Sequence, residues 1–141
     1  MSIGIENIIV FFPIIIFPTV IIIFISIYIK TQKPVDVELV RDALYKETCG
    51  GWIGSSNSTF PFVRIAFYDE FVVIVNLRNR IILNYDQITD VSMFYKTMKK
   101  GVKISHSRTD IPERIVVWTL NDESLIERIN IFIRNNRAEK T

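Results

Sequence analysis

The sequence predicts a mainly β domain of about seven strands with a C-terminal α-helix, preceded by one N-terminal transmembrane helix. Three observations predict it: a long uncharged apolar run near the N-terminus, a period-two alternation of apolar residues from Trp52 onward, and a helical apolar stripe near the C-terminus. With 141 residues, the chain has room for one domain of ordinary size and a short appendage. We therefore expect a single hydrophobic core behind the apolar run.

The apolar run extends from Ile8 to Ile29 and contains 22 residues without a charge. As a helix it would be about 33 Å long, which matches a bilayer hydrocarbon core of roughly 30 Å. A cleaved signal peptide is the alternative, but that needs preceding basic residues and a shorter apolar run. Only Glu6 is charged before the run. We predict an uncleaved anchor, which Pro13 and Pro18 either kink or break at a partner's surface.

The charges that flank the run predict its orientation. Lys30 and Lys33 follow it directly, whereas no basic residue precedes it. Because the basic flank of a membrane helix tends to stay in the cytoplasm, residues 1–7 are expected outside the cell membrane and the domain inside. Pro34 disfavours helix at the residue before it, so the anchor should end there.

Residues 30–49 are predicted to form a juxtamembrane linker that contains a helix. Asp36 is suited to cap a helix that reaches about Thr48, with Gly50 just past its end. One face of this helix would carry Val37, Val40 and Leu44.

About seven strands are expected after this linker. The clearest is Val63–Tyr68, in which Arg64 falls on the opposite face from Val63 and Ile65. The other expected strands lie around Trp52–Ile53, Phe71–Val75, Arg80–Leu83, Val91–Tyr95, Val102–His106 and Arg114–Leu120.

The last element is predicted to be an amphipathic helix. Asn121 or Asp122 is suited to cap it, and it should end near Arg134. Because one helix must cover an apolar opening of the strands, we expect two orthogonal sheets plugged at one end by this helix, followed by a polar tail at residues 137–141. The apolar stripe of the helix consists of Leu125, Ile126, Ile129, Phe132 and Ile133.

This order of elements resembles the pleckstrin-homology-like superfold, including its bacterial and GRAM-like branches. The resemblance implies a PH-like barrel over residues 50–136, behind an anchor in the inner (cell) membrane. Members that bind phosphoinositides carry basic residues in the first strand-to-strand loop, and the matching loop here, Gly54–Thr59, has none. The resemblance therefore does not imply specific inositol-phosphate binding. Three stretches are similar to strand segments of small membrane-anchored bacterial proteins with such a domain: Pro61–Val75, Ile81–Val91 and Gly101–His106.

The sequence predicts no catalytic, cofactor or metal site. Cys49 is the only cysteine and His106 the only histidine, so neither a disulfide framework nor a zinc cluster is expected. His106 is in phase with Val102 and is interpreted as a packed strand residue rather than a catalytic base. Cys49 is interpreted as a small apolar side chain, with a nucleophile or a lipidated cysteine as alternatives.

One basic cluster is a candidate contact site. Four lysines gather around a turn that precedes Gly101, and 17 basic against 15 acidic residues leave the rest of the chain nearly neutral. The cluster is either a solvated hairpin tip or a contact with anionic lipid or an acidic partner, and nucleic acid is not expected as a partner. The four residues are Lys96, Lys99, Lys100 and Lys103.

Together these features predict a non-enzymatic, membrane-anchored interaction module. Its domain would bind a protein, another copy of the chain or, weakly, anionic lipid. The alternative is a small single-pass subunit of a larger membrane complex, in which the anchor itself makes the contacts.

Overall fold

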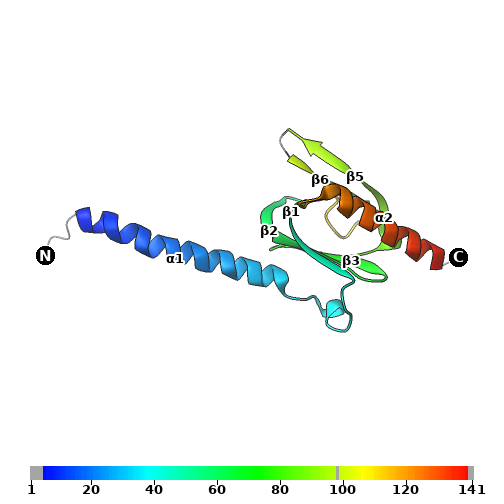
Figure 1. Ribbon diagram of the computed structural model, residues 1–141, viewed down its shortest axis with the longest axis horizontal. Coiled ribbons are helices and arrows are strands. Elements are labelled where there is room, and N and C mark those ends of the chain that lie inside the picture. The colour runs from blue at the N-terminus through cyan, green and yellow to red at the C-terminus, as the bar shows by residue number, and fades with distance from the viewer. Residues whose placement is uncertain (1–4, 98, 140–141) are drawn as a thin grey trace.

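The structure is a computed structural model that describes residues 5–97 and 99–139, with side chains described over residues 14–97 and 99–138. It confirms the predicted fold class: an N-terminal apolar helix, seven antiparallel strands and a C-terminal helix. The strands curl into a half-barrel beside one end of the N-terminal helix (Figure 1).

The N-terminal helix α1 runs without interruption from Ile5 to Gln32, through both prolines. The interpretation in which Pro13 and Pro18 break the helix is therefore wrong. Among the described residues, this is the one helix long and apolar enough to cross a membrane, over Ile14–Gln32. It ends just before Lys33, as Pro34 predicted.

The helix predicted from Asp36 to about Thr48 is wrong. The chain forms only a single turn of 3₁₀ helix, η1 (Asp36–Glu38), and then the first strand, β1 (Tyr45–Ile53). Three apolar residues are a narrow helical stripe, and the pairing of Tyr45 with Phe67 on the next strand outweighs it. The first strand is thus much longer than the Trp52–Ile53 segment expected from the sequence.

The strands form one continuous sheet of order β4-β3-β2-β1-β7-β6-β5, rather than two separate orthogonal sheets. The sheet is continuous because β1 pairs with β2 along one edge and with β7 along the other. The turn between β1 and β2 is also shorter than the expected Gly54–Thr59 loop, since β2 already begins at Ser56. The remaining strands are β2 (Ser56–Phe67), β3 (Phe71–Val75), β4 (Arg80–Asn84), β5 (Ile88–Lys96), β6 (Lys99–His106) and β7 (Ile115–Trp118).

The C-terminal helix α2 (Asp122–Glu139) packs into the open side of the half-barrel, as predicted. Leu125 and Ile129 are completely or almost completely buried, and the Phe132 ring stacks between those of Phe67 and Tyr85, 5.4 and 5.6 Å away. A second 3₁₀ turn, η2 (Tyr85–Gln87), links β4 to β5.

A second apolar cluster covers the outer face of β2 and β3. Ala66, Tyr68, Phe71 and Val73 are buried there, and Val35 from the linker after α1 packs against them. The sheet is therefore buried on both faces in this region, because the chain between α1 and β1 folds back over it.

Candidate functional site

The linker is fastened to the outer face of β2 by a buried arginine. Only 1% of Arg64 is exposed, and its Nη1 and Nη2 donate hydrogen bonds of 2.5 and 2.6 Å to the two carboxylate oxygens of Glu38. Its Nε also donates to the carbonyl of Thr31 at 3.1 Å, and Nη2 donates to that of Lys33 at 3.3 Å. Arg64 therefore binds η1 and the end of α1 at the same time.

The Glu38 carboxylate has two further donors. The hydroxyl of Tyr68 lies 2.8 Å from Oε1, and the backbone N–H of Val35 lies 2.5 Å from Oε2. Burial opposes the charge, but hydrogen bonds from Arg64, Val35 and Tyr68 outweigh it and hold the pKa of Glu38 below its usual range. Burial and the adjacent carboxylate raise the pKa of Tyr68 to about 12. The pair is therefore ionised, and Tyr68 is protonated, at neutral pH.

Arg64 also completes the C-terminal end of α1. The last carbonyls of a helix lack partners within the helix and carry its negative dipole end, where a cation is favourable. The guanidinium supplies both donors and charge to Thr31 and Lys33. This places the end of α1 at a defined position on the sheet.

A second cluster, the tryptophan–lysine face, occupies the outer face of β1, β7 and β6. Both tryptophans of the chain lie here, each beside a cation. The Nζ of Lys96 lies 4.6 Å from the centre of the Trp52 ring, and Lys99 lies 5.2 Å from Trp118. Arg114 approaches Trp52 to 4.2 Å. We define this face by Trp52, Lys96, Lys99, Arg114 and Trp118.

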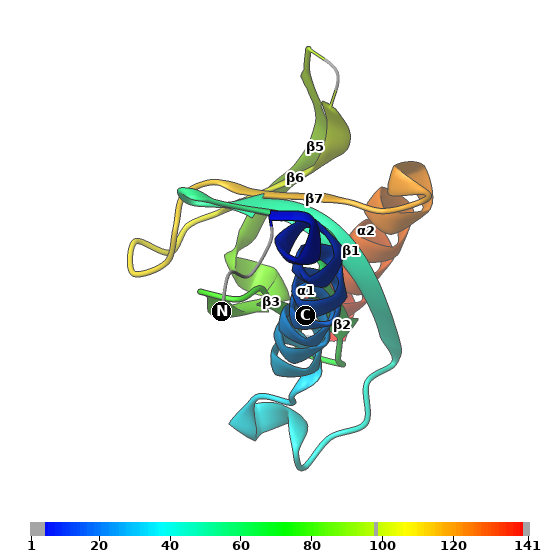
Figure 2. The same ribbon diagram turned by 90° about the vertical axis from the view of Figure 1, so that its left-hand side faces the viewer.

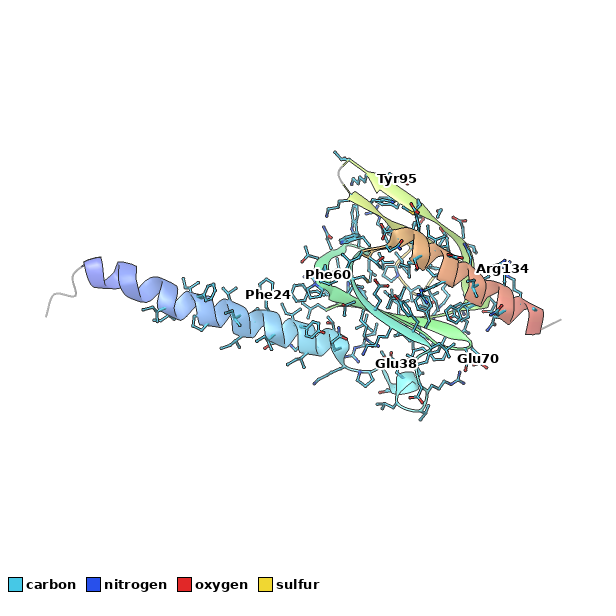
Figure 3. The ribbon with its side chains drawn as sticks, in the orientation of Figure 1. Phe24, Glu38, Phe60, Glu70, Tyr95 and Arg134 are labelled. Carbon is cyan, nitrogen blue, oxygen red and sulfur yellow. The ribbon has the colours of Figure 1, made fainter. Side chains whose placement is uncertain are left out.

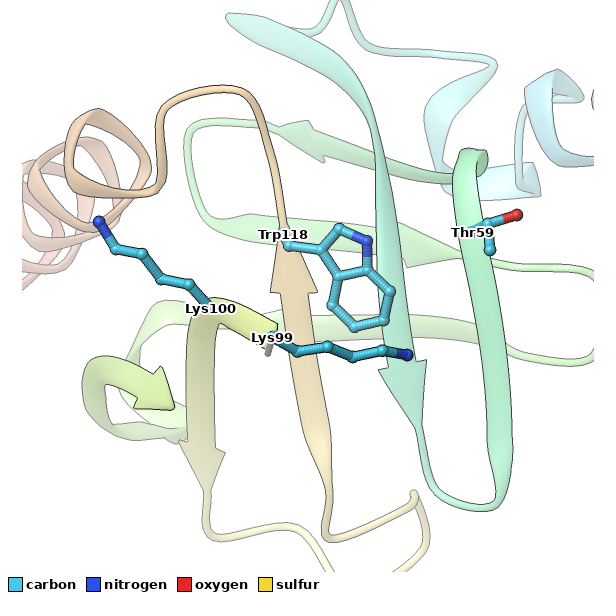
Figure 4. Close-up of a pocket in the computed structure, with 4 residues that line it drawn as sticks. All are labelled: Thr59, Lys99, Lys100 and Trp118. Carbon is cyan, nitrogen blue, oxygen red and sulfur yellow. The ribbon is translucent and has the colours of Figure 1, made fainter. Parts of the chain in front are cut away.

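The four lysines predicted as a contact site have different neighbours in the structure. Lys96 and Lys99 join the tryptophans, whereas Lys100 turns the other way and lies 3.4 Å from the carboxylate of Glu123 on α2 (Figure 4). Lys103 is exposed and lines a hollow with Phe94. The alternation of side chains along β6 sends Lys99 and Lys100 to opposite faces.

Gly50 makes room for the indole of Trp118, and Gly101 lets β6 approach the backbone of β7. A Cβ at Gly50 would lie 1.9 Å from the indole Nε1, and one at Gly101 would lie 2.8 Å from the carbonyl of Val117. The indole therefore lies flat against β1, in the position that the side chain of Gly50 would otherwise fill. This fixes the ring rigidly on the surface.

The face contains two shallow hollows. One of about 390 Å³ is lined by Trp52, Asn57 and Lys96 together with Thr97 and Lys99. Another, of about 300 Å³, is lined by Thr59, Lys99, Lys100 and Trp118, as Figure 4 shows. Aromatic walls with lysine ammonium groups at the rim suit an anionic group attached to an apolar body.

The tryptophan–lysine face is on the same side of the domain as α1. In the view toward the N-terminal side of the helix, β1, β6 and β7 lie nearer to the viewer than α2 (Figure 2). Because the core and α2 lie behind these strands, their outer face is directed toward that side. A membrane that surrounds α1 would therefore face this surface.

The other residues considered from sequence lie in the interior or have local partners. Cys49 is completely buried in the core, and burial raises the pKa of its thiol far above the usual range. His106 is half-buried, with its Nε2 3.0 Å from the carbonyl of Pro112. These environments support the packed roles interpreted for both residues.

Sequence reasoning missed Arg64, Glu38, the two tryptophans and Arg114. The available signal was the charge of Arg64 inside the apolar stretch Pro61–Val75. A charged residue there needs a partner, but nothing in the strand period identifies Glu38, which is 26 residues earlier.

A comparison of the chain with protein-family models finds no match, and no curated protein matches its sequence.

Proposed function

We propose that this protein is a non-catalytic interaction module anchored in the cell membrane by α1, with a PH-like domain on the cytoplasmic side. In this proposal the tryptophan–lysine face contacts the anionic headgroups of the same membrane. The observation that carries it is the bidentate Arg64–Glu38 pair, which holds the end of α1 against the sheet while the basic and aromatic face is directed to the side of α1.

Electrostatic attraction alone is weak at this face. Each lysine or arginine near an anionic leaflet contributes about 1 kcal/mol, so Lys96, Lys99 and Arg114 supply roughly 3 kcal/mol before salt screening. Tethering by α1 keeps the face at a high effective concentration near the leaflet. Weak attraction is then enough to orient the domain.

A binding role is favoured over catalysis by the state of the two candidate catalytic residues. The Cys49 thiol is buried and protonated, so it is a poor nucleophile. The His106 ring has a backbone partner at Nε2. Neither side chain is arranged as a nucleophile with an adjacent base.

The two tryptophans provide a direct test because both belong to the proposed contact surface. The full chain is placed in nanodiscs of neutral lipid or of a mixture with anionic phosphatidylserine, and quenching of tryptophan emission by acrylamide is measured. We expect less quenching in anionic discs at low salt, and loss of this protection in high salt because screening weakens the attraction.

A charge-matched pair of variants makes the test specific. The double variant Lys96→Glu/Lys99→Glu should lose the protection by anionic lipid. The control Arg128→Glu/Arg134→Glu makes the same change in charge on two exposed side chains of α2, outside the face, and it should retain most of the protection. Equal loss in both variants, or no protection in the unmodified chain, would contradict the proposed lipid contact.

A second candidate function is that of a small subunit in a larger membrane complex. It is favoured by exposed apolar residues in the linker between α1 and β1, where Leu39 is 68% and Val40 is 82% exposed. Exchange of Ile8–Ile29 for an unrelated single-pass helix separates the two functions. Activity in the cell should survive the exchange for an anchored module and be lost for a subunit whose anchor makes the contacts.

A further inference from the structure

The last turns of α1 lie directly against β2. The helix presents Phe24, Ile27 and Thr31 to the strand, at positions i, i+3 and i+7. Thr31 is completely buried, and the ring of Phe24 lies 5.3 Å from that of Phe62. The outer face of β2 therefore lies beside the last turns of α1 (Figure 3).

This contact is located well inside the apolar part of α1. Phe24 precedes Lys30, the first charged residue after the apolar run, by six positions, or about 9 Å along the helix axis. Ile22, Ile25 and Ile29 are exposed around the helix at this level. A leaflet that covers these isoleucines also reaches the Phe24–Phe62 pair.

The outer face of β2 is apolar where it lies beside the apolar part of α1. Phe62 and Arg64 are two apart on β2 and both face α1, since the Phe62 ring lies against Phe24 and Arg64 bonds the carbonyl of Thr31. Phe60 is 54% exposed, and Ser56–Val63 contains no charge. The Phe62 ring lies at the level of the apolar helix residue Phe24, and the arginine lies at the level where the helix ends.

Residues 59–62 of β2 are not paired in regular register with β1. Cys49 pairs with Val63 and Gly51 pairs with Ser58, so residues 59–62 of β2 stand opposite Gly50 alone. They bulge from the sheet on the side of α1 and carry two aromatic rings. Such rings are favoured at the boundary between headgroups and hydrocarbon.

We propose that Phe60 and Phe62 enter the lipid leaflet that surrounds the last turns of α1, so that the domain is partly embedded beside its own anchor. The partner is the interfacial layer of the bilayer, because the segment that carries both rings lies beside the apolar part of α1. This inference rests on the proposed function in one respect, that α1 spans a membrane.

The test uses an environment-sensitive NBD label on single cysteines in the full chain, in phosphatidylcholine nanodiscs. Neutral lipid is used because it removes the electrostatic attraction of the tryptophan–lysine face. The native Cys49 is completely buried with a raised thiol pKa, so it does not compete for the label. Three single-cysteine variants are labelled. Phe60→Cys tests the inference, and Ile25→Cys tests whether α1 spans the bilayer. Arg134→Cys on α2, which lies far from α1 in Figure 3, is the control for a label in water.

We expect the label at position 60 to show blue-shifted emission and quenching by nitroxide lipids, as at position 25, whereas position 134 shows neither. The inference would be overturned if the label at position 60 behaves like the label at position 134 while the label at position 25 reports lipid. That result would still agree with α1 as a membrane anchor. If the label at position 25 shows the unshifted emission of a water-exposed label, both the membrane span and the inference are overturned. Each variant is accepted only if its thermal melt matches the unmodified chain, and Phe62→Cys replaces Phe60→Cys if the latter does not match.

Discussion

Arg64 places a full charge in the interior, where an unpaired ion would be strongly unfavourable. Each of its three guanidinium nitrogens donates to a protein oxygen, and Glu38 receives four donors in return. The pair connects three segments of the chain: the end of α1, the linker and β2. Its principal effect is therefore to specify where α1 attaches to the domain.

Arg64→Met tests the energetic contribution of this connection. Removal of one member of a buried ion pair leaves the other unpaired, which costs about 3–5 kcal/mol. We expect the free energy of unfolding of the full chain in mild detergent, measured by urea titration, to fall by that amount. The exposed Arg41–Glu70 pair provides the matched control, and Arg41→Met should cost at most about 1 kcal/mol. Equal effects of the two substitutions would contradict the assigned role.

The lowered pKa of Glu38 predicts a dependence of stability on pH. The carboxylate is favoured in the folded chain, so its contribution is complete above the unfolded-state pKa of about 4.5 and is lost as the pH falls through the lower folded-state value. The stability advantage of the unmodified chain over Glu38→Gln should be constant from pH 7 to about 5 and should shrink below that. An advantage that persists unchanged in stronger acid would contradict the ionised pair. Other carboxylates, such as Asp110 beside Arg108, are common to both chains and cancel.

At this scale, the strand period predicted where Arg64 lies but not its surroundings. Alternation correctly put it on the face opposite Val63 and Ile65, and a one-sided sheet would have left that face in water. The linker instead returns across the face and buries it. Such a return is a long-range contact, which local periodicity does not encode.

The elements with strong periodic patterns were predicted well. The apolar run and the amphipathic α2 were found because a helix repeats over many residues. Val63–Tyr68 was found because its apolar residues alternate, and Phe71–Val75 because it is a short apolar run that follows a polar turn. The predicted helix after Asp36 failed because its stripe was short. There, pairing of β1 with both β2 and β7 decided the structure.

The packing of α2 predicts a contrast between two isoleucines of that helix. Ile129 is completely buried in the core, whereas Ile131 is 39% exposed. Ile129→Asp puts an unpaired carboxylate into the core, so the full chain in detergent should lose its cooperative thermal melt. Ile131→Asp introduces the same group on the same helix and should melt nearly as the unmodified chain does. An unchanged melt for Ile129→Asp would mean that α2 does not close the half-barrel.

At the scale of the whole molecule, the fold joins three features on one side of the domain. The end of α1, the aromatic bulge of β2 and the tryptophan–lysine face all lie where a membrane around α1 would be. Lys96 and Lys99 were predicted as candidate contact residues, but their positions beside the two tryptophans could not be predicted, because these residues come from different strands. The same is true of Gly50, which makes room for Trp118. The side chains of the tryptophan–lysine face point the same way only because the sheet curls.

The orientation of the chain decides which leaflet this side of the domain meets. Lys30 and Lys33 follow the apolar run and no basic side chain precedes it, so a reporter fused after Thr141 should be cytoplasmic. An impermeant label applied outside intact cells should not reach a C-terminal tag. Transfer of the positive charge, by Ser2→Lys and Asn7→Lys together with Lys30→Gln and Lys33→Gln, should move part of the population to the opposite orientation. Labelling of the unmodified chain from outside would contradict the prediction. It would also remove the electrostatic basis of the proposed function, since the anionic lipids that attract lysine are concentrated in the cytoplasmic leaflet.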